Sequence, residues 1–177
     1  YMSMDKSIET REDGTSSQVN EPLAIVGMGV RLPGQSIDVE SFWDFLAEGR
    51  SGIVEVPEDR WDIERYYHPD GTVPGTMVTK WGGFVENVEK FDARFWGITP
   101  REAMRMDPQQ RWLLEVAWEA IEDAGVAPRD LRGQKVGVFV GVSTHDYSGI
   151  QGVDISQTDA HTNSGITLSI ASNRISY

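Results

Sequence analysis

Three features of the 177-residue sequence predict an α/β fold with a largely buried sheet. Two short apolar runs, at residues 22–29 and 135–143, have the length and composition of buried strands. Amphipathic runs that start with helix-capping residues lie between and after them. The composition is globular, with 39% hydrophobic and 25% charged residues. Strands that alternate with helices are typical of layered α/β domains, so we expect this architecture.

The chain divides into a short leader and one domain. Residues 1–20 are polar and lack periodicity, so we interpret them as a flexible leader or linker. Residues 21–177 are long enough to build one core. The 16 basic and 28 acidic residues give a net charge of −12, which disfavours nucleic acid and anionic membranes as partners. No apolar run approaches the roughly 20 residues of a membrane span, and no signal core is present, so we expect a cytoplasmic protein.

The first half of the domain begins with a strand and a capped helix. Pro22–Gly29 is the first predicted strand, and Asp38 is the predicted N-cap of a helix that stops at Gly49. The buried stripe of this helix is predicted to be Phe42, Phe45 and Leu46. Gly27 and Gly29 lead into a loop and not a helix, so close backbone packing is favoured over dinucleotide binding. Residues 51–98 predict a structured excursion with a hairpin arm in 75–85 and a surface turn at His68.

The second half contains two helix starts, a strand and a final helix. Thr99 caps a short helix, and Asp107 caps a longer one that Gln110 supports through a capping-box spacing and Gly125 ends. Its buried face is predicted to be Leu113, Ala117, Ala120, Ile121 and Ala124, and its solvated carboxylates Glu119, Glu122 and Asp123. Lys135–Ser143 is the strongest predicted strand. A loop over 144–160 and a helix over 163–177 are expected to follow.

The residues alone define no reactive centre. The sequence has no cysteine, which removes disulfides, thiolate metal sites and a cysteine nucleophile from this chain. None of the histidines, His68, His145 and His161, has metal-ligand spacing. His145 and His161 follow the second strand, where α/β folds build sites. Structural and functional roles therefore both stay open for these two side chains.

Five blocks in order resemble the N-terminal part of a β-ketoacyl synthase (ketosynthase) domain of modular or iterative polyketide synthases. They are EPLAIVGMGVRLPG, SFWDFLAEGRSGIVEVPEDRWD, KWGGFVENVEKFDARFWGITPREAMRMDPQQRWLLEVAWEAIEDAG, VGVFVGVSTHDY and NSGITLSIASNRISY, and together they span residues 21–177. The resemblance implies a thiolase-like layered αβαβα fold that is usually a homodimer. This chain would be the first part of its N-terminal half.

The resemblance also implies a decarboxylative Claisen condensation. An acyl group passes from the phosphopantetheine arm of an acyl carrier protein to an active-site cysteine, and the carbanion formed from a malonyl-type extender attacks it. The family order places that cysteine and two histidines beyond Tyr177, so no catalytic residue is assigned in this chain. The implied partners are the remainder of the ketosynthase, the carrier protein and a second copy of the enzyme. This chain itself binds no cofactor, because the phosphopantetheine arm belongs to the carrier protein.

The family order assigns six residues to the wall of the substrate pocket or its dimer side. Thr144 and His145 would lie near the acyl pocket, and 160–164 where one protomer approaches its partner's pocket. The candidates are Thr144, His145, Ala160, His161, Asn163 and Ser164, with no metal ligand among them. His145 and His161 do not match the catalytic histidine motifs of the family. Ile166 stands where a common family form has asparagine, so this part of the lining differs.

Three hypotheses about the whole protein follow. The chain is an ordered portion of a polyketide ketosynthase, one chain of a split enzyme whose other chain supplies the reactive residues, or a non-catalytic scaffold or dimerisation module. The intact helix caps and the alternating strand favour the first two. In each case this segment alone is predicted to be inactive.

Overall fold

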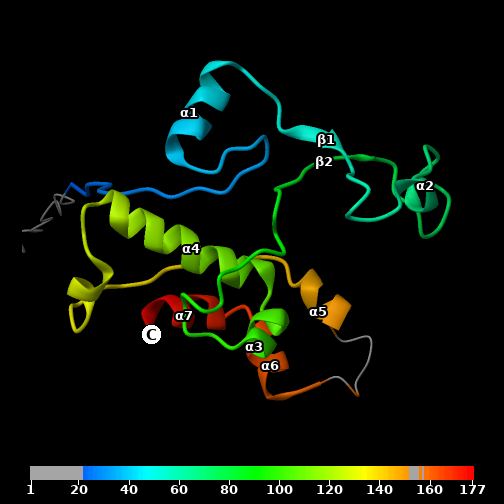
Figure 1. The fold of residues 1–177 in the computed structure, drawn as a ribbon. Helices are drawn as coiled ribbons and strands as arrows, with labels where there is room; N and C mark the ends of the chain where they lie inside the picture. The colour runs from blue at the N-terminus through cyan, green and yellow to red at the C-terminus, as the bar shows by residue number, and fades with distance from the viewer. Residues whose placement is uncertain (1–21, 152–155, 157) are drawn as a thin grey trace, which may run out of the picture.

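The structure is a computed structural model that describes residues 22–151, 156 and 158–177, so the predicted leader lies outside the described residues. Helices and short strands follow one another along this part of the chain (Figure 1). The elements are α1 (Val39–Ala47), β1 (Ile53–Glu55), α2 (Ile63–Tyr66), β2 (Trp81–Gly83), α3 (Pro100–Arg105), α4 (Pro108–Asp123), η1 (Pro128–Leu131), α5 (Asp146–Gln151), α6 (Ala160–Ile166) and α7 (Ile170–Ser176).

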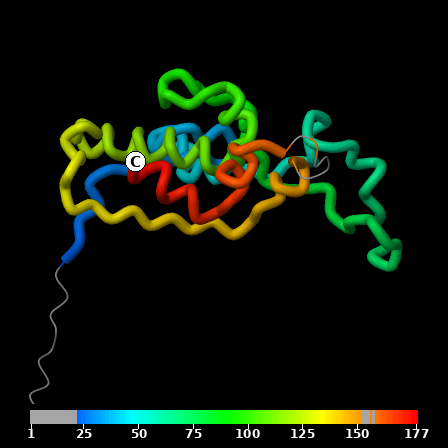
Figure 2. Tube along the Cα trace, turned by 90° about the horizontal axis from the view of Figure 1, so that it is seen from below, coloured from blue at the N-terminus to red at the C-terminus, as the bar shows by residue number. Residues whose placement is uncertain are grey.

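The long helix α4 runs through the middle of the molecule. The N-terminal segment and α1 lie on one side of it, and α7 lies on the other, with the extended chain 135–143 passing beside both α4 and α7 (Figures 1 and 2). α7 packs against α4, and α6 packs against α3. Most of the buried apolar side chains come from these helices and the turn between α3 and α4: Met106, Ala171, Leu114 and Ala103. The core of the described residues is therefore mainly helical.

The helix starts are confirmed by their hydrogen bonds. Asp38 accepts from the amide of Ser41 at 2.8 Å and forms a full capping box with it. Thr99 caps α3, and Asp107 caps α4. The glycine expected to follow each of two helix ends, Gly49 and Gly125, has a left-handed backbone with φ of 64° and 70°.

The predicted hairpin arm is also confirmed. β1 and β2 pair antiparallel, with Ile53 opposite Gly83 and Glu55 opposite Trp81. The chain between them carries α2 and projects away from α4 (Figure 1). Within it, the expected surface turn after His68 is formed by Asp70, whose carboxylate accepts from the amide of Thr72 at 3.0 Å.

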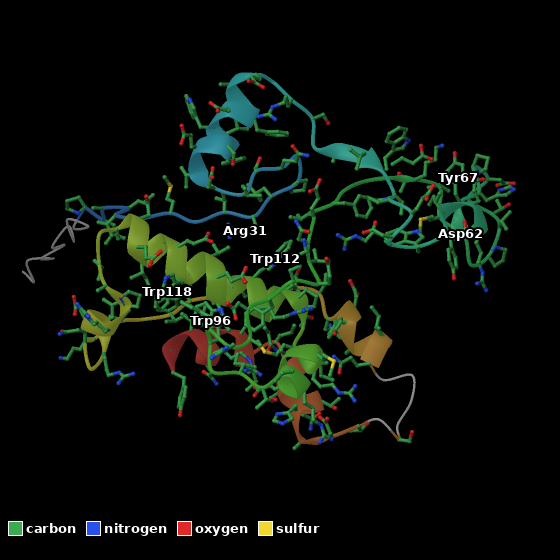
Figure 3. All side chains as sticks on the ribbon, viewed as in Figure 1. Arg31, Asp62, Tyr67, Trp96, Trp112 and Trp118 are labelled. Carbon is green, nitrogen blue, oxygen red and sulfur yellow. The ribbon has the colours of Figure 1, made fainter. Side chains whose placement is uncertain are left out.

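Aromatic side chains gather beside α4. Trp96, from the segment before α3, lies next to Trp118 of α4 (Figure 3), with ring centroids 5.6 Å apart and perpendicular planes. Phe95 contacts both rings edge to face. Edge-to-face packing favours such clusters beyond the area that they bury. This cluster fixes the segment before α3 on the middle of α4.

The two main predicted strands, 22–29 and 135–143, are wrong as strands and as buried elements. Both segments are extended, but neither has a ladder partner among the described residues. Leu23, Val26 and Phe139 are 99%, 72% and 96% exposed. A strand exists only where a neighbouring backbone satisfies its amide and carbonyl groups, and that neighbour is not encoded in the run itself.

Gly27 and Gly29 confirm the packing interpretation over the nucleotide one. A Cβ atom on Gly27 would lie 2.1 Å from the carbonyl oxygen of Ala120, and one on Gly29 would lie 2.6 Å from that of Val116. Only glycine permits backbone contact at these distances. The first extended segment therefore crosses α4 directly.

Two of the carboxylates assigned to a solvated face of α4 bind this crossing segment. Glu119 forms a bidentate ion pair with the guanidinium of Arg31. Asp123 accepts a hydrogen bond of 2.9 Å from the backbone amide of Met28. Asp123 and Glu122 are both exposed, as predicted, whereas Glu119 is half-buried. The prediction failed for Glu119 because an extended segment, which has its own polar groups to satisfy, covers its side of the helix.

The predicted apolar stripes are shifted. In α1, Phe42 and Phe45 are half-buried, but Leu46 is 54% exposed. In α4, the five predicted face residues are only half-buried, and the buried ones are Gln110, Arg111 and Leu114. At the start of α4 the buried positions are therefore occupied by the polar side chains Gln110 and Arg111, where the helical period predicts apolar ones.

The C-terminal part is more broken than predicted. The expected loop over 144–160 contains α5, and the single helix expected over 163–177 consists of α6 and α7 with a break at Thr167. Asp159 caps α6 through the amides of His161 and Thr162, which gives this short helix its own start. The last third of the chain is therefore a series of short helices.

Candidate functional site

A buried glutamine joins α4 to the break between α6 and α7. Gln110 is 3% exposed, and its amide nitrogen donates to the carbonyl oxygens of Ser164 at 3.2 Å and Thr167 at 3.1 Å. Its amide oxygen accepts from Nε of Arg174 at 2.8 Å. The helix break would leave the two carbonyl oxygens without a hydrogen-bond partner, and burial would do the same to the Nε of Arg174. The amide of Gln110 satisfies all three groups. The sequence assigned Gln110 to a capping box, and that assignment is wrong.

A chain of charges extends this contact to α3 and α6. The guanidinium of Arg174 donates to Oε1 of Glu102 at 2.8 Å, and Oε2 of the same carboxylate lies 3.9 Å from Nδ1 of His161. The arginine and glutamate side chains are 14% and 23% exposed, so water screens this pair only in part. Glu102 of α3 therefore binds Arg174 of α7, and its second oxygen faces His161 of α6.

Asp159 forms a second charged contact beside the first. Its carboxylate pairs with Arg101 at 2.9 Å and with Arg105 at 3.7 Å, while it also accepts from the amides of His161 and Thr162. Burial alone would raise the pKa of Asp159. The hydrogen bonds and the positive charge of Arg101 outweigh burial and hold the pKa at about 2. Asp159 stays ionised across the physiological range and fixes α6 on α3.

Two of the six predicted site residues, Thr144 and His145, lie before α5 and are exposed. The carbonyl oxygen of Thr144 accepts from the side chain of Gln109 at 3.1 Å. The carbonyl oxygen of His145 accepts from the amide of Ser148 at 3.0 Å, as a residue at a helix start does. Their backbones thus hold the start of α5 near the start of α4.

The other four, Ala160, His161, Asn163 and Ser164, lie in α6. Ala160 and Asn163 are exposed, whereas His161 and Ser164 reach the charge chain and the Gln110 contact. The structure therefore brings α6 to the α3–α4 corner, and α5 contacts α6. None of the six lines the hollow between α1 and α4 or the one between α4, η1 and α7. No group of potential metal ligands occurs in the described part of the chain, and the six stay a prediction.

The residues that organise this corner were missed as a group: Glu102, Gln110, Asp159 and Arg174. A signal was available for α4, where Gln110 and Arg111 interrupt the stripe that leads to Leu114. Arg111 is 8% exposed and donates to the carbonyl oxygen of Glu89 at 3.1 Å. No local pattern identifies the partners of Glu102 or Arg174, because they are far away in the sequence.

The family model described as "Beta-ketoacyl synthase, N-terminal domain" matches residues 20–177. The chain belongs to this family, as part of its N-terminal domain. It is 54% identical over 159 residues to one component of the phenolphthiocerol/phthiocerol polyketide synthase of Mycobacterium tuberculosis. It is 49% identical over 161 residues to another component of the same synthase. The alignments cover 90% and 91% of this chain but only 10% and 9% of those proteins.

Solved ketosynthases share the fold. A ketosynthase domain of the oxazolomycin system of Streptomyces albus JA3453 superposes with a TM-score of 0.76 at 38% identity, over 86% of this chain and 27% of that one. The ketosynthase from module 6 of the bacillaene synthase of Bacillus subtilis 168 gives 0.72 at 36% identity, over 87% and 24%. The predicted family and the thiolase-like α/β fold class are therefore confirmed. The chain spans about a quarter of these ketosynthase chains.

The described helices also bear on the membrane question that the sequence raised. In the part of the chain that the structure describes, no helix combines the length and apolar character that crossing a bilayer requires.

Proposed function

We propose that this chain is part of a ketosynthase that catalyses the decarboxylative Claisen condensation of an acyl thioester with a malonyl-type extender on an acyl carrier protein. The observation that carries the proposal is the family match over residues 20–177, together with relatives that belong to polyketide synthases. The coarse function, a ketosynthase N-terminal domain of a polyketide synthase, follows from those comparisons. The reaction and its partners are inferred from the family.

In the proposed reaction the acyl group moves from the carrier thiol to a cysteine thiolate, which releases the carrier thiol. The extender loses carbon dioxide, and the electron pair left on its α-carbon attacks the acyl carbonyl. The new carbon–carbon bond forms as the enzyme thiolate leaves. This chain has no cysteine, so the nucleophile must come from other residues of the complete enzyme.

The chain's own contribution in this proposal is structural. Gln110 holds the end of α6 against the start of α4, and the ion pair of Asp159 with Arg101 holds its start against α3. These contacts position the candidate wall residues His161 and Ser164 of α6. A second copy of the enzyme and the phosphopantetheine arm of a carrier protein are the proposed partners at that wall. The cytoplasmic location stays a prediction.

Acylation with a radiolabelled carrier-bound acyl thioester tests the proposal. The full product of the native gene should become labelled through a thioester that hydroxylamine releases, whereas the 177-residue segment alone should stay unlabelled. Failure of the full product to take up label, or a stable thioester on the cysteine-free segment, would contradict the proposed reaction. The same preparations distinguish the alternatives, because labelling that needs a second polypeptide indicates a split enzyme.

The candidate wall has its own test. In the full product, Asn163→Leu changes an exposed residue that makes only backbone bonds in the structure. We expect it to alter the selectivity among acyl chain lengths with little change in thermal stability. Unchanged selectivity for this variant and for His161→Leu removes the α6 residues from the proposed wall.

A further inference from the structure

A hollow of about 940 Å³ lies between α1, the β1–β2 arm and α4, away from the α3–α6 corner. Its walls come from the loop 31–37, the segments 50–57 and 84–92, and the side of α4 that carries Trp112 and Glu115. In Figure 3, Arg31 and Trp112 lie in the space between α1 and α4. The volume falls in the range of about 300–1,000 Å³ that is typical of ligand sites.

The walls of this hollow are largely apolar and aromatic. The main side chains are Leu32, Ile37, Phe45, Phe84, Phe91 and Trp112. The three phenylalanines and Trp112 are half-buried and line the hollow, so each presents part of its ring to it. Aromatic side chains of this kind are enriched in protein recognition surfaces.

The unpaired charge in the hollow is negative. Glu86, Asp92 and Glu115 form no ion pair with any cation among the described residues, and the same is true of one lining cation, Lys90. The other two lining cations are already neutralised. Arg31 pairs with Glu119, and Arg50 pairs with Glu48 at 2.9 Å. Three carboxylates without an ion pair against one such ammonium leave an excess of negative charge.

These carboxylates occupy different depths. Glu86 and Asp92 are exposed at the rim, whereas Glu115 is half-buried on α4 in the same wall as Trp112. Burial raises the pKa of Glu115, and the charge of Arg31 opposes this only in part. A half-buried carboxylate without a counter-ion is stabilised by any cation that reaches it.

Two residues with a left-handed backbone also line the hollow. In the described part of the chain, the non-glycine residues with positive φ are Gln35, at 63°, and Asn87, at 58°. They come from different walls, one in the loop before α1 and one in the segment after β2, and both line the hollow. Such conformations persist where the surroundings hold them, and they concentrate at binding sites.

We propose that this hollow binds an extended polypeptide segment in which lysine or arginine side chains alternate with apolar ones. Aromatic walls accept the apolar side chains, while the carboxylates at the rim and on α4 pair with cations spaced along the segment. The carboxylates stand apart, with Glu86 and Asp92 at the rim and Glu115 on the α4 wall. This separation suits several cations on one chain better than a single small ammonium ion. This site is separate from the proposed reaction and does not depend on it.

Fluorescence anisotropy with a labelled peptide of alternating lysine and leucine tests the proposal on the full native protein. We expect binding that weakens with added salt, and much weaker binding of a matched peptide of alternating glutamate and leucine. Glu115→Gln and Asp92→Asn should each weaken binding by about tenfold, because each removes one charge-assisted contact. Glu122→Gln, which removes an exposed carboxylate of α4 outside the hollow, should leave binding unchanged.

Three results would overturn the peptide-binding proposal. Equal affinity for the lysine and glutamate peptides, or equal effects of Glu115→Gln and Glu122→Gln, would overturn the proposal. Competition by free spermidine at the concentration that the peptide needs would assign the site to small polyamines instead, which also overturns it. If Glu115→Gln fails to fold by circular dichroism, Glu86→Gln at the exposed rim gives the same comparison. None of these measurements requires turnover, so their failure leaves the ketosynthase proposal untouched.

Discussion

Replacing Gln110 with methionine should strongly destabilise the α6–α7 corner. Methionine has nearly the same length but offers no amide, so the carbonyl oxygens of Ser164 and Thr167 and the Nε of Arg174 lose their partner. Two neutral hydrogen bonds contribute about 1 kcal/mol each, and one to a charged group about 1.5–3 kcal/mol. The free energy of unfolding should therefore fall by about 4 kcal/mol, since the site is buried and water cannot replace the amide.

Urea unfolding followed by tryptophan fluorescence measures this loss, because Trp96 and Trp118 report on the packing around α4. Gln109→Met is the matched control on the preceding residue, which is only half-buried and donates to one carbonyl outside its own turn. The control should lose at most about 1 kcal/mol. Amide exchange of α7 should rise selectively in Gln110→Met. Equal losses in the two variants, or unchanged exchange in α7, would refute the role assigned to Gln110.

Three further predictions concern other contacts. Gly27→Ala places a Cβ atom 2.1 Å from the carbonyl oxygen of Ala120, so limited proteolysis should cut the N-terminal segment faster than in the parent, and an equal cutting rate argues against the close crossing. Trp118→Leu opens the aromatic cluster and should lower the free energy of unfolding by about 2–4 kcal/mol in urea titrations, and a neutral result contradicts the packing argument. For Asp159, a folded-state pKa of about 2 against a usual value of 3.8 means that its stabilisation is complete above about pH 4 and is lost as pH falls toward 2. Asp159→Asn should therefore flatten the acid limb of the stability profile, and an unchanged limb argues against the pairing with Arg101.

Local signals in the sequence identified features whose physics is local. Asp38 and Asp107 start helices because a short carboxylate reaches amides two or three residues ahead, whatever the rest of the fold does. Gly49 and Gly125 stop helices because a left-handed residue costs least as glycine. The ordered motif blocks identified the ketosynthase family, which the family match confirmed.

The errors arose where the outcome depends on a distant neighbour. The predicted strands at 22–29 and 135–143 carry the right composition, but a strand needs a partner backbone that composition does not specify. Glu119 was assigned to solvent because the helix pattern does not show that an extended segment crosses that face. The candidate wall residues in α6 stay a prediction, because the pocket that they would line includes parts of a ketosynthase outside this chain.

By itself the sequence determined the family, the starts of α1, α3 and α4, the ends of α1 and α4, and the hairpin arm, since nearby residues mark each of them. The absence of a cysteine nucleophile from these 177 residues is read directly from their composition. Only the tertiary structure decided that Gln110 holds the α6–α7 break, and that Glu102 joins Arg174 to His161. Those contacts span more than fifty residues of chain. Which buried polar groups meet across such a distance is settled by packing, because each must find a partner once water is excluded.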